Sequence, residues 1–249
     1  MIDYRRLFAR ITCALIPFKD IRKRCRLIFL YGHLKDLLVK RAGLRRFSGP
    51  FDWVSDAPFE RRIELLSEGL SDFFRREDLV SSGEKVVYAE GSLEPHTVYY
   101  NKHTKLRHPH DFSFHGEFKK DFEALAKKYE RRCKRLIHLL KTSKRVLLVY
   151  GETDRGVDFL DRGRVVSLLA KLQAVYPAVI DLLYLKRNCA MSPEEVEIKS
   201  HALRGGGLYF GLYRGLDAEE ASPEAEKINE RLRRSITLWL IVHIALRER

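Results

Sequence analysis

The chain has 249 residues, of which 45% are hydrophobic and 33% charged, a balance typical of folded globular proteins that excludes a disordered chain. This length suits one domain with a short appendage. The formal net charge is +13, and residues 1–46 carry much of it, with thirteen Lys and Arg against three Asp. The asymmetry predicts an anionic partner for the amino-terminal region.

Several functional classes are excluded by the same composition. The longest largely apolar run, residues 236–246, is too short for a transmembrane helix. The four cysteines are scattered without a CxxC pair, so we expect no disulfide framework and no metal site, and a reducing, cytoplasmic location. No zinc-finger, RNP or helix-turn-helix signature is present, so no specific nucleic-acid partner is predicted. Nothing in the sequence indicates a cofactor.

Residues 1–24 form a segment of their own, with the pattern of a basic amphipathic helix. Leu7, Ile11 and Leu15 share one face, and arginines occupy much of the remainder. Two interpretations stay open: a helix lying on the anionic inner face of a membrane, or a surface helix packed on the domain. The stretch ALIPFKDIRKRCR also resembles the amino-terminal stretch of bacterial enzymes that build surface polysaccharide at the inner membrane.

Residues 25–249 are predicted to form a single α/β domain. Apolar runs and helical periodicity alternate along it, which favours a mostly parallel sheet in a three-layer arrangement with helices on its faces. The predicted strands are 27–31, 85–89, 98–101, 145–150, 178–185 and 208–213, and the predicted helices are 34–42, 59–75, 118–141, 163–176 and 223 to the end. In such sheets functional groups gather at the carboxyl ends of the strands. That rule selects Gly32-His33, the turn at Glu152, and Cys189.

Three sequence blocks carry a resemblance to a known family. They are GLRRFSGPFDWV at residues 43–54, PHDF at residues 109–112 after Asn101-Lys102, and KYERRCKRLIHLLKTSKRVLLVY at residues 128–150. Over residues 27–151 the chain resembles the bacterial family catalogued as putative papain-like cysteine peptidases. The resemblance implies a nucleophilic cysteine in a Gly-x-x-Cys-like turn after the first strand, assisted by a histidine.

The expected cysteine is not present in this chain. The turn survives at Gly32, but His33 takes the place of the thiol. Cys25 precedes the strand and therefore lies at its opposite edge. Cys133 falls on the core-facing stripe of a helix, and Cys189 has no nucleophile motif around it. We therefore expect an altered or inactive member of the family.

His110 is the best candidate for a general base, with Asp111 or Asp52 as the carboxylate that orients it. Adjacent residues on a strand point in opposite directions, which counts against Asp111 in that role. His33 has four open interpretations: a general base, an oxyanion donor, an anion-binding group, or a polar turn residue left after loss of catalysis.

The candidate substrate-binding residues are Ser48, Trp53, Arg132 and Glu152. Trp53 and Asp52 lie on a loop where an aromatic ring and a carboxylate line a pocket, or where Asp52 instead pins the loop through backbone N–H groups. Arg132 lies near the buried edge of its helix and suits an anionic group. All these predictions assume that the Gly32 turn, the SGPFDW loop and the PHDF segment meet at one rim of the sheet.

Three functions remain open on this basis. The first is an altered or inactive relative of the cysteine peptidases, acting on a peptide. The second is a membrane-peripheral transferase or accessory protein of bacterial surface polysaccharide biosynthesis, acting on a sugar or another small molecule. The third is a non-catalytic binding module that keeps the fold without the thiol.

Overall fold

The structure is a computed structural model that describes residues 26–31, 48–88, 92–151, 162–187, 191–192, 195–203, 206–213 and 227. The predicted basic segment 1–24 and the predicted helix at 34–42 lie outside these residues, and so does nearly all of the predicted carboxy-terminal helix. Within the described part of the chain, no helix is long and apolar enough to cross a membrane.

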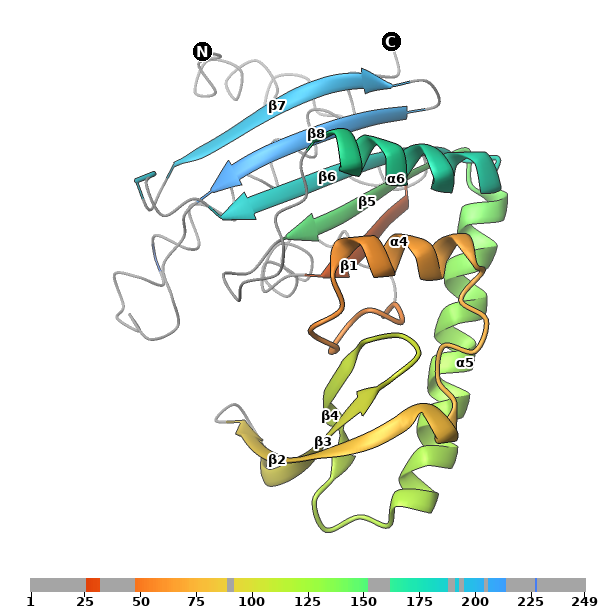
Figure 1. The fold of residues 1–249 in the computed structure, drawn as a ribbon, viewed down its shortest axis with the longest axis vertical. Coiled ribbons are helices and arrows are strands. Elements are labelled where there is room, and N and C mark those ends of the chain that lie inside the picture. The colour runs from red at the N-terminus through yellow and green to blue at the C-terminus, as the bar shows by residue number, and fades with distance from the viewer. Residues whose placement is uncertain are drawn as a thin grey trace, which may run out of the picture.

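A five-stranded sheet forms the larger half of the described chain (Figure 1). Its strands, in spatial order, are β1 (Arg26–Tyr31), β5 (Arg145–Gly151), β6 (Val179–Arg187), β8 (Gly206–Tyr213) and β7 (Val196–Leu203). The first four are parallel, as the alternation of apolar runs and helices predicts. The edge strand β7 is antiparallel to β8 and was not predicted from the sequence.

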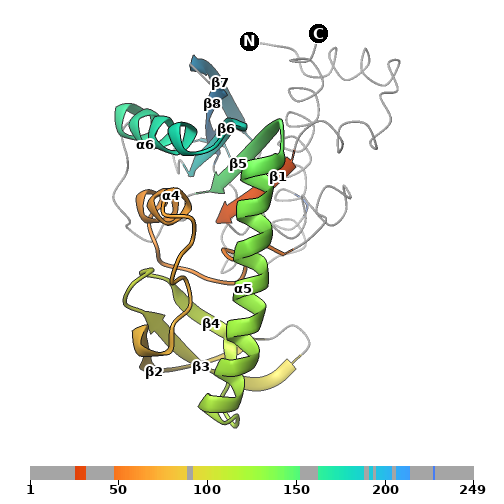
Figure 2. The same cartoon turned by 90° about the vertical axis from the view of Figure 1, so that its right-hand side faces the viewer.

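Two helices, α4 (Phe59–Ser67) and α6 (Arg162–Val175), pack against each other beside this sheet (Figures 1 and 2). Their buried leucines join the apolar residues of β5 and β6 in one core. Since the described helices do not show a layer on each face, the three-layer arrangement stays a prediction. The division into residues 1–24 and a domain from residue 25 is likewise untested.

The helix predicted over 59–75 is shorter than expected. It ends at Ser67 because Gly69 adopts a left-handed conformation with φ 74°. The amide of Gly69 donates to the carbonyl of Leu66, and that of Leu70 donates to the carbonyl of Leu65, which is a Schellman cap. The apolar spacing continues past the cap, so periodicity alone overestimated the helix.

A second sheet, with three antiparallel strands, replaces the two short strands expected in this region. Its strands are β2 (Leu79–Tyr88), β3 (Ser92–Asn101) and β4 (Arg107–Ser113). The long helix α5 (Phe118–Thr142) runs from this sheet to the five-stranded one (Figure 2). Its buried stripe, predicted from 3- and 4-residue steps, carries Leu125, Tyr129, Cys133, Leu136 and Leu140. A single core cluster therefore includes residues of both sheets.

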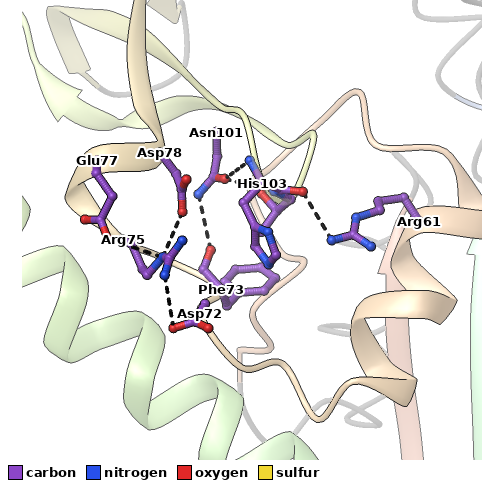
Figure 3. Close-up of polar contacts among 9 residues, drawn as sticks. Arg61, Asp72, Phe73, Arg75, Glu77, Asp78, Asn101 and His103 are labelled. Carbon is purple, nitrogen blue, oxygen red and sulfur yellow. Dashed lines mark hydrogen bonds and ion pairs between the residues drawn. The ribbon is translucent and has the colours of Figure 1, made fainter.

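The connection from α4 to β2, which includes the 3-10 turn Arg76–Asp78, is fixed to the β3–β4 turn by the buried side chain of Asn101 (Figure 3). Its amide nitrogen donates to the carbonyl of Phe73 at 3.3 Å, and its oxygen accepts from the amides of His103 and Thr104 at 3.0 and 2.9 Å. Arg61 of α4 donates to the carbonyl of His103. Asn101 thus serves as a structural anchor in the block that precedes PHDF.

Candidate functional site

The loop at residues 48–56 is held rigidly beside β4. Asp52 is buried, and its carboxylate accepts the amide of Gly49 at 2.9 Å. Ser55 and Arg107 exchange two backbone hydrogen bonds of 3.0 Å, which join the loop to the start of β4. Phe51 packs edge-on against Phe73 in the core. The carboxylate of Asp52 therefore pins the loop, as one of its two predicted roles required.

The PHDF segment forms a pronounced bulge in β4. Thr97 of β3 is paired with Phe112, and Tyr99 is paired with His108, so three residues of β4 lie opposite one residue of β3. Pro109 begins this bulge, in keeping with the confinement of proline to edges and bulges of sheets. A bulge changes which side chains face each side of a strand. The rule that adjacent side chains on a strand point in opposite directions, which was used to predict the role of Asp111, therefore does not apply here.

Inside the bulge, Asp111 lies at the centre of a buried polar cluster. Its carboxylate accepts from Nδ1 of His108 at 2.9 Å, from the hydroxyl of Tyr129 at 2.5 Å and from the ammonium of Lys128 at 2.5 Å. Burial alone would raise the pKa of this carboxyl. The hydrogen bond to His108, the charge of that ring and the charge of Lys128 outweigh burial and hold the pKa well below its usual range. Asp111 is therefore a carboxylate at neutral pH.

His108 is fully enclosed. Its ring makes edge-on contacts with Phe74 and Tyr129, with centroids at 5.1 and 5.4 Å, and it has no exposed surface. With Nδ1 facing Asp111, Nε2 is buried and has no hydrogen-bond partner among the described residues. A histidine oriented by a carboxylate has the arrangement of a general base, but a substrate cannot reach this ring in the observed conformation.

The outer side of the bulge carries His110, which contacts the ring of Trp53. The two rings are 5.7 Å apart and meet at 77°, an edge-to-face geometry. Trp53 is 39% exposed and has φ 68°, a left-handed conformation that is costly for a bulky residue. Strained residues of this kind concentrate at binding and catalytic sites. Trp53 and His110 thus form an aromatic pair, with Trp53 exposed and His110 half-buried, on a rigid support.

The other predicted residues are placed less centrally. Ser48 is half-buried at the start of the loop, and Arg132 is half-buried on α5, where its guanidinium lies 5.7 Å from the ring of Tyr129. His33 and Glu152 lie outside the described residues. The structure therefore brings the SGPFDW loop and the PHDF segment together, while the third part of the predicted pocket, the Gly32 turn, remains a prediction.

Cys133 is the one cysteine among the described residues, and it is buried as its place on the helical stripe predicts. Burial raises the pKa of its thiol to about 12, with Arg132 opposing the shift only in part. The thiol is therefore protonated at neutral pH and is unsuited to nucleophilic attack.

Sequence reasoning gave too little weight to three residues of this site: His108, Lys128 and Tyr129. His108 directly precedes the PHDF block, and the other two lie on α5. The available signal was Pro109, because a proline inside a strand indicates a bulge. With a bulge assumed, His108 and Asp111 come to the same face.

Comparison with known families and proteins adds one result. Residues 32–175 match the family described as putative papain-like cysteine peptidase. The chain belongs to this family. The match begins at the Gly32 turn and continues through α6, beyond the predicted limit of residue 151, and it includes both the SGPFDW loop and the PHDF bulge. No match was found among curated proteins or among solved structures.

Proposed function

We propose that this chain is a member of the putative papain-like cysteine peptidase family that has lost thiol catalysis and retains a ligand-binding face at Trp53 and His110. A peptide is the ligand class that the family membership suggests. In this proposal the chain recognises its ligand without cleaving it through a cysteine.

The main support is the inward position of the PHDF carboxylate. Asp111 already accepts hydrogen bonds from His108, Lys128 and Tyr129, and the side chains of Asp111 and His108 are enclosed beneath the strand. The carboxylate–histidine pair that resembles a catalytic dyad is therefore His108–Asp111, which no substrate reaches, and does not include the half-buried His110. Cysteine peptidases need an accessible thiolate beside an accessible histidine.

The cysteines supply independent support. Cys133 is buried and protonated. The family resemblance places the nucleophile at the Gly32 turn, where the sequence has His33. A rigid loop that exposes Trp53 in a strained conformation fits a recognition surface, because large aromatic side chains often anchor bound ligands.

The direct test is a cysteine-free chain with Cys13→Ser, Cys25→Ser, Cys189→Ser and Cys133→Ala. Wild type and variant are assayed for hydrolysis of a mixed fluorogenic peptide library, before and after iodoacetamide, and for capture of the uncleaved peptides. We expect no thiol-dependent turnover in either protein and the same peptides retained by both. Hydrolysis by the wild type that disappears in the cysteine-free chain, with its fold intact by circular dichroism, contradicts the proposal.

A second candidate function is attachment to an anionic membrane on its cytoplasmic side, in polysaccharide assembly. The charge pattern favours it, since residues 1–24 are rich in arginine and lysine and α5 exposes Lys119, Lys120, Lys127 and Arg131. Deleting residues 1–24 should release the chain from vesicles that contain phosphatidylglycerol. Unchanged retention on these vesicles counts against this candidate.

A further inference from the structure

A groove lies between α5 and the turn that follows α4, and neither the SGPFDW loop nor the PHDF segment lines it. The turn comprises residues 69–75 and runs alongside the helix (Figure 1). The groove has a volume of about 580 Å³, within the range of small-molecule sites. We call it the α5 groove.

The floor of the α5 groove is apolar. It is lined by the buried side chains of Leu70, Phe73, Tyr129 and Cys133, with the half-buried Ile137 beside them. Above these buried residues, Phe74, Ala126 and Ile137 are half-buried and still expose apolar surface to the groove. A hydrocarbon that covers this surface removes it from water, which lowers the free energy.

The rim carries charged and basic side chains, and among the described residues that line it, basic side chains without a close acidic partner lie only on α5. Arg75 lies 3.8, 3.4 and 3.0 Å from Asp72, Glu77 and Asp78, so its charge is already matched (Figure 3). Lys134 is paired with Glu130 at 2.5 Å.

His138 and Lys141 follow on the same face of α5 and are exposed. No carboxylate of the described residues lies within ion-pair distance of either. These two side chains can therefore bind a negatively charged group above the apolar floor.

The turn that forms the opposite wall is held in an unusual backbone conformation. Leu70 and Asp72 have φ of 56° and 55°, and both are left-handed residues that are not glycine. A leucine in this region costs roughly 1–2 kcal/mol, and such strain is found where a chain segment holds a ligand. Asn101 fixes the turn from behind through the carbonyl of Phe73, so the wall is preorganised.

We propose that the α5 groove binds an amphipathic anion with a single hydrocarbon chain, such as an alkyl phosphate or a lipid of that type. The chain lies on the floor formed by Phe73 and Ile137, and the anionic head lies at His138 and Lys141. This site is separate from the Trp53–His110 face and does not depend on the function proposed for that face.

The experiment titrates the full chain with dodecyl phosphate, below its critical micelle concentration, by isothermal calorimetry. Inorganic phosphate and dodecanol are the parallel probes, since each carries half of the proposed ligand chemistry. We expect saturable one-to-one binding of dodecyl phosphate and affinities at least about tenfold weaker for the other two. No saturable binding, or equal binding of either probe, overturns the proposal.

Two pairs of variants locate the site. His138→Gln with Lys141→Gln should weaken binding of dodecyl phosphate by about tenfold. His115→Gln with Lys120→Gln removes the same two groups near the other end of α5, where both are exposed, and should leave binding unchanged. Equal losses in both pairs indicate non-specific charge attraction and contradict the site. Ile137→Trp, which fills the floor without changing charge, should abolish binding while thermal unfolding stays within a few degrees; full retention of binding also contradicts the site.

Discussion

The two sides of the β4 bulge differ in what their polar residues do. On the inner side, His108 and Asp111 are buried and bonded to α5, and their contacts contribute to the stability of the fold. On the outer side, His110 meets an exposed and conformationally strained Trp53. Residues 108–111 thus divide between a buried structural side and an outer side for which we propose ligand recognition. A sequence motif with a histidine beside an aspartate therefore does not by itself identify a catalytic pair.

The largest effect is expected from Asp111→Ala. This substitution leaves His108, Lys128 and Tyr129 without their shared acceptor, and breaking a buried charged cluster costs about 3 kcal/mol or more. The free energy of unfolding, measured in urea, should fall by roughly that amount. His110→Ala is the matched control on the outer side and should change it by less than about 1 kcal/mol. A larger loss for His110→Ala than for Asp111→Ala reverses the comparison.

Lowering the pH should reduce the stability that the Asp111 cluster contributes on the inner side of the bulge. The pKa of Asp111 is lower in the folded chain than in the unfolded one. Its contribution is therefore complete above the unfolded value of about 3.9, and it is lost as the pH falls through the lower folded value. The free energy of unfolding should begin to drop below about pH 5 and continue to drop below about pH 3. Asp111→Asn should flatten this dependence, and an identical slope in both proteins shows that another carboxylate is responsible.

The smallest effect is expected from two substitutions of Trp53, which distinguish the role of its ring from that of its backbone conformation. Trp53→Ala and Trp53→Gly both remove the aromatic ring, but only glycine adopts φ 68° without strain. The glycine variant should be more stable than the alanine variant by about 1 kcal/mol, seen as a higher melting temperature. Both should lose peptide capture equally if the proposed ligand binds to the ring. Equal melting temperatures would mean that the loop relaxes out of the left-handed conformation.

Much of the larger sheet could be predicted from the sequence because each element has a pattern of apolar residues within its own segment. The apolar run at residues 145–150 and the stripe of α5 reflect burial directly. The second sheet is harder to predict because β2 is exposed over most of its length and lacks an alternating apolar pattern. The edge strand β7 also carries polar residues at four of its eight positions.

The site was predicted in part for a similar reason. The loop and the PHDF segment could be placed together from their shared family pattern, and the structure joins them through Ser55 and Arg107. The bonding of Asp111 could not be predicted, because it depends on how many residues of β4 lie opposite one residue of β3. Tyr129 and Lys128 enter the cluster only after α5 packs on the sheet, and such a contact between distant segments has no local signature.

The 25-residue helix α5 also restricts how the chain can vary in length. One half of its buried stripe packs at the small sheet, and the other half belongs to the core cluster that includes residues of the large sheet. Both halves must therefore keep the same helical phase. Inserting one residue in the middle would rotate one half by about 100° relative to the other and turn a charged face into the core. Insertions should therefore be tolerated in the loops that flank α5 and rejected within it, which ties the relative orientation of the two sheets to the length of one helix.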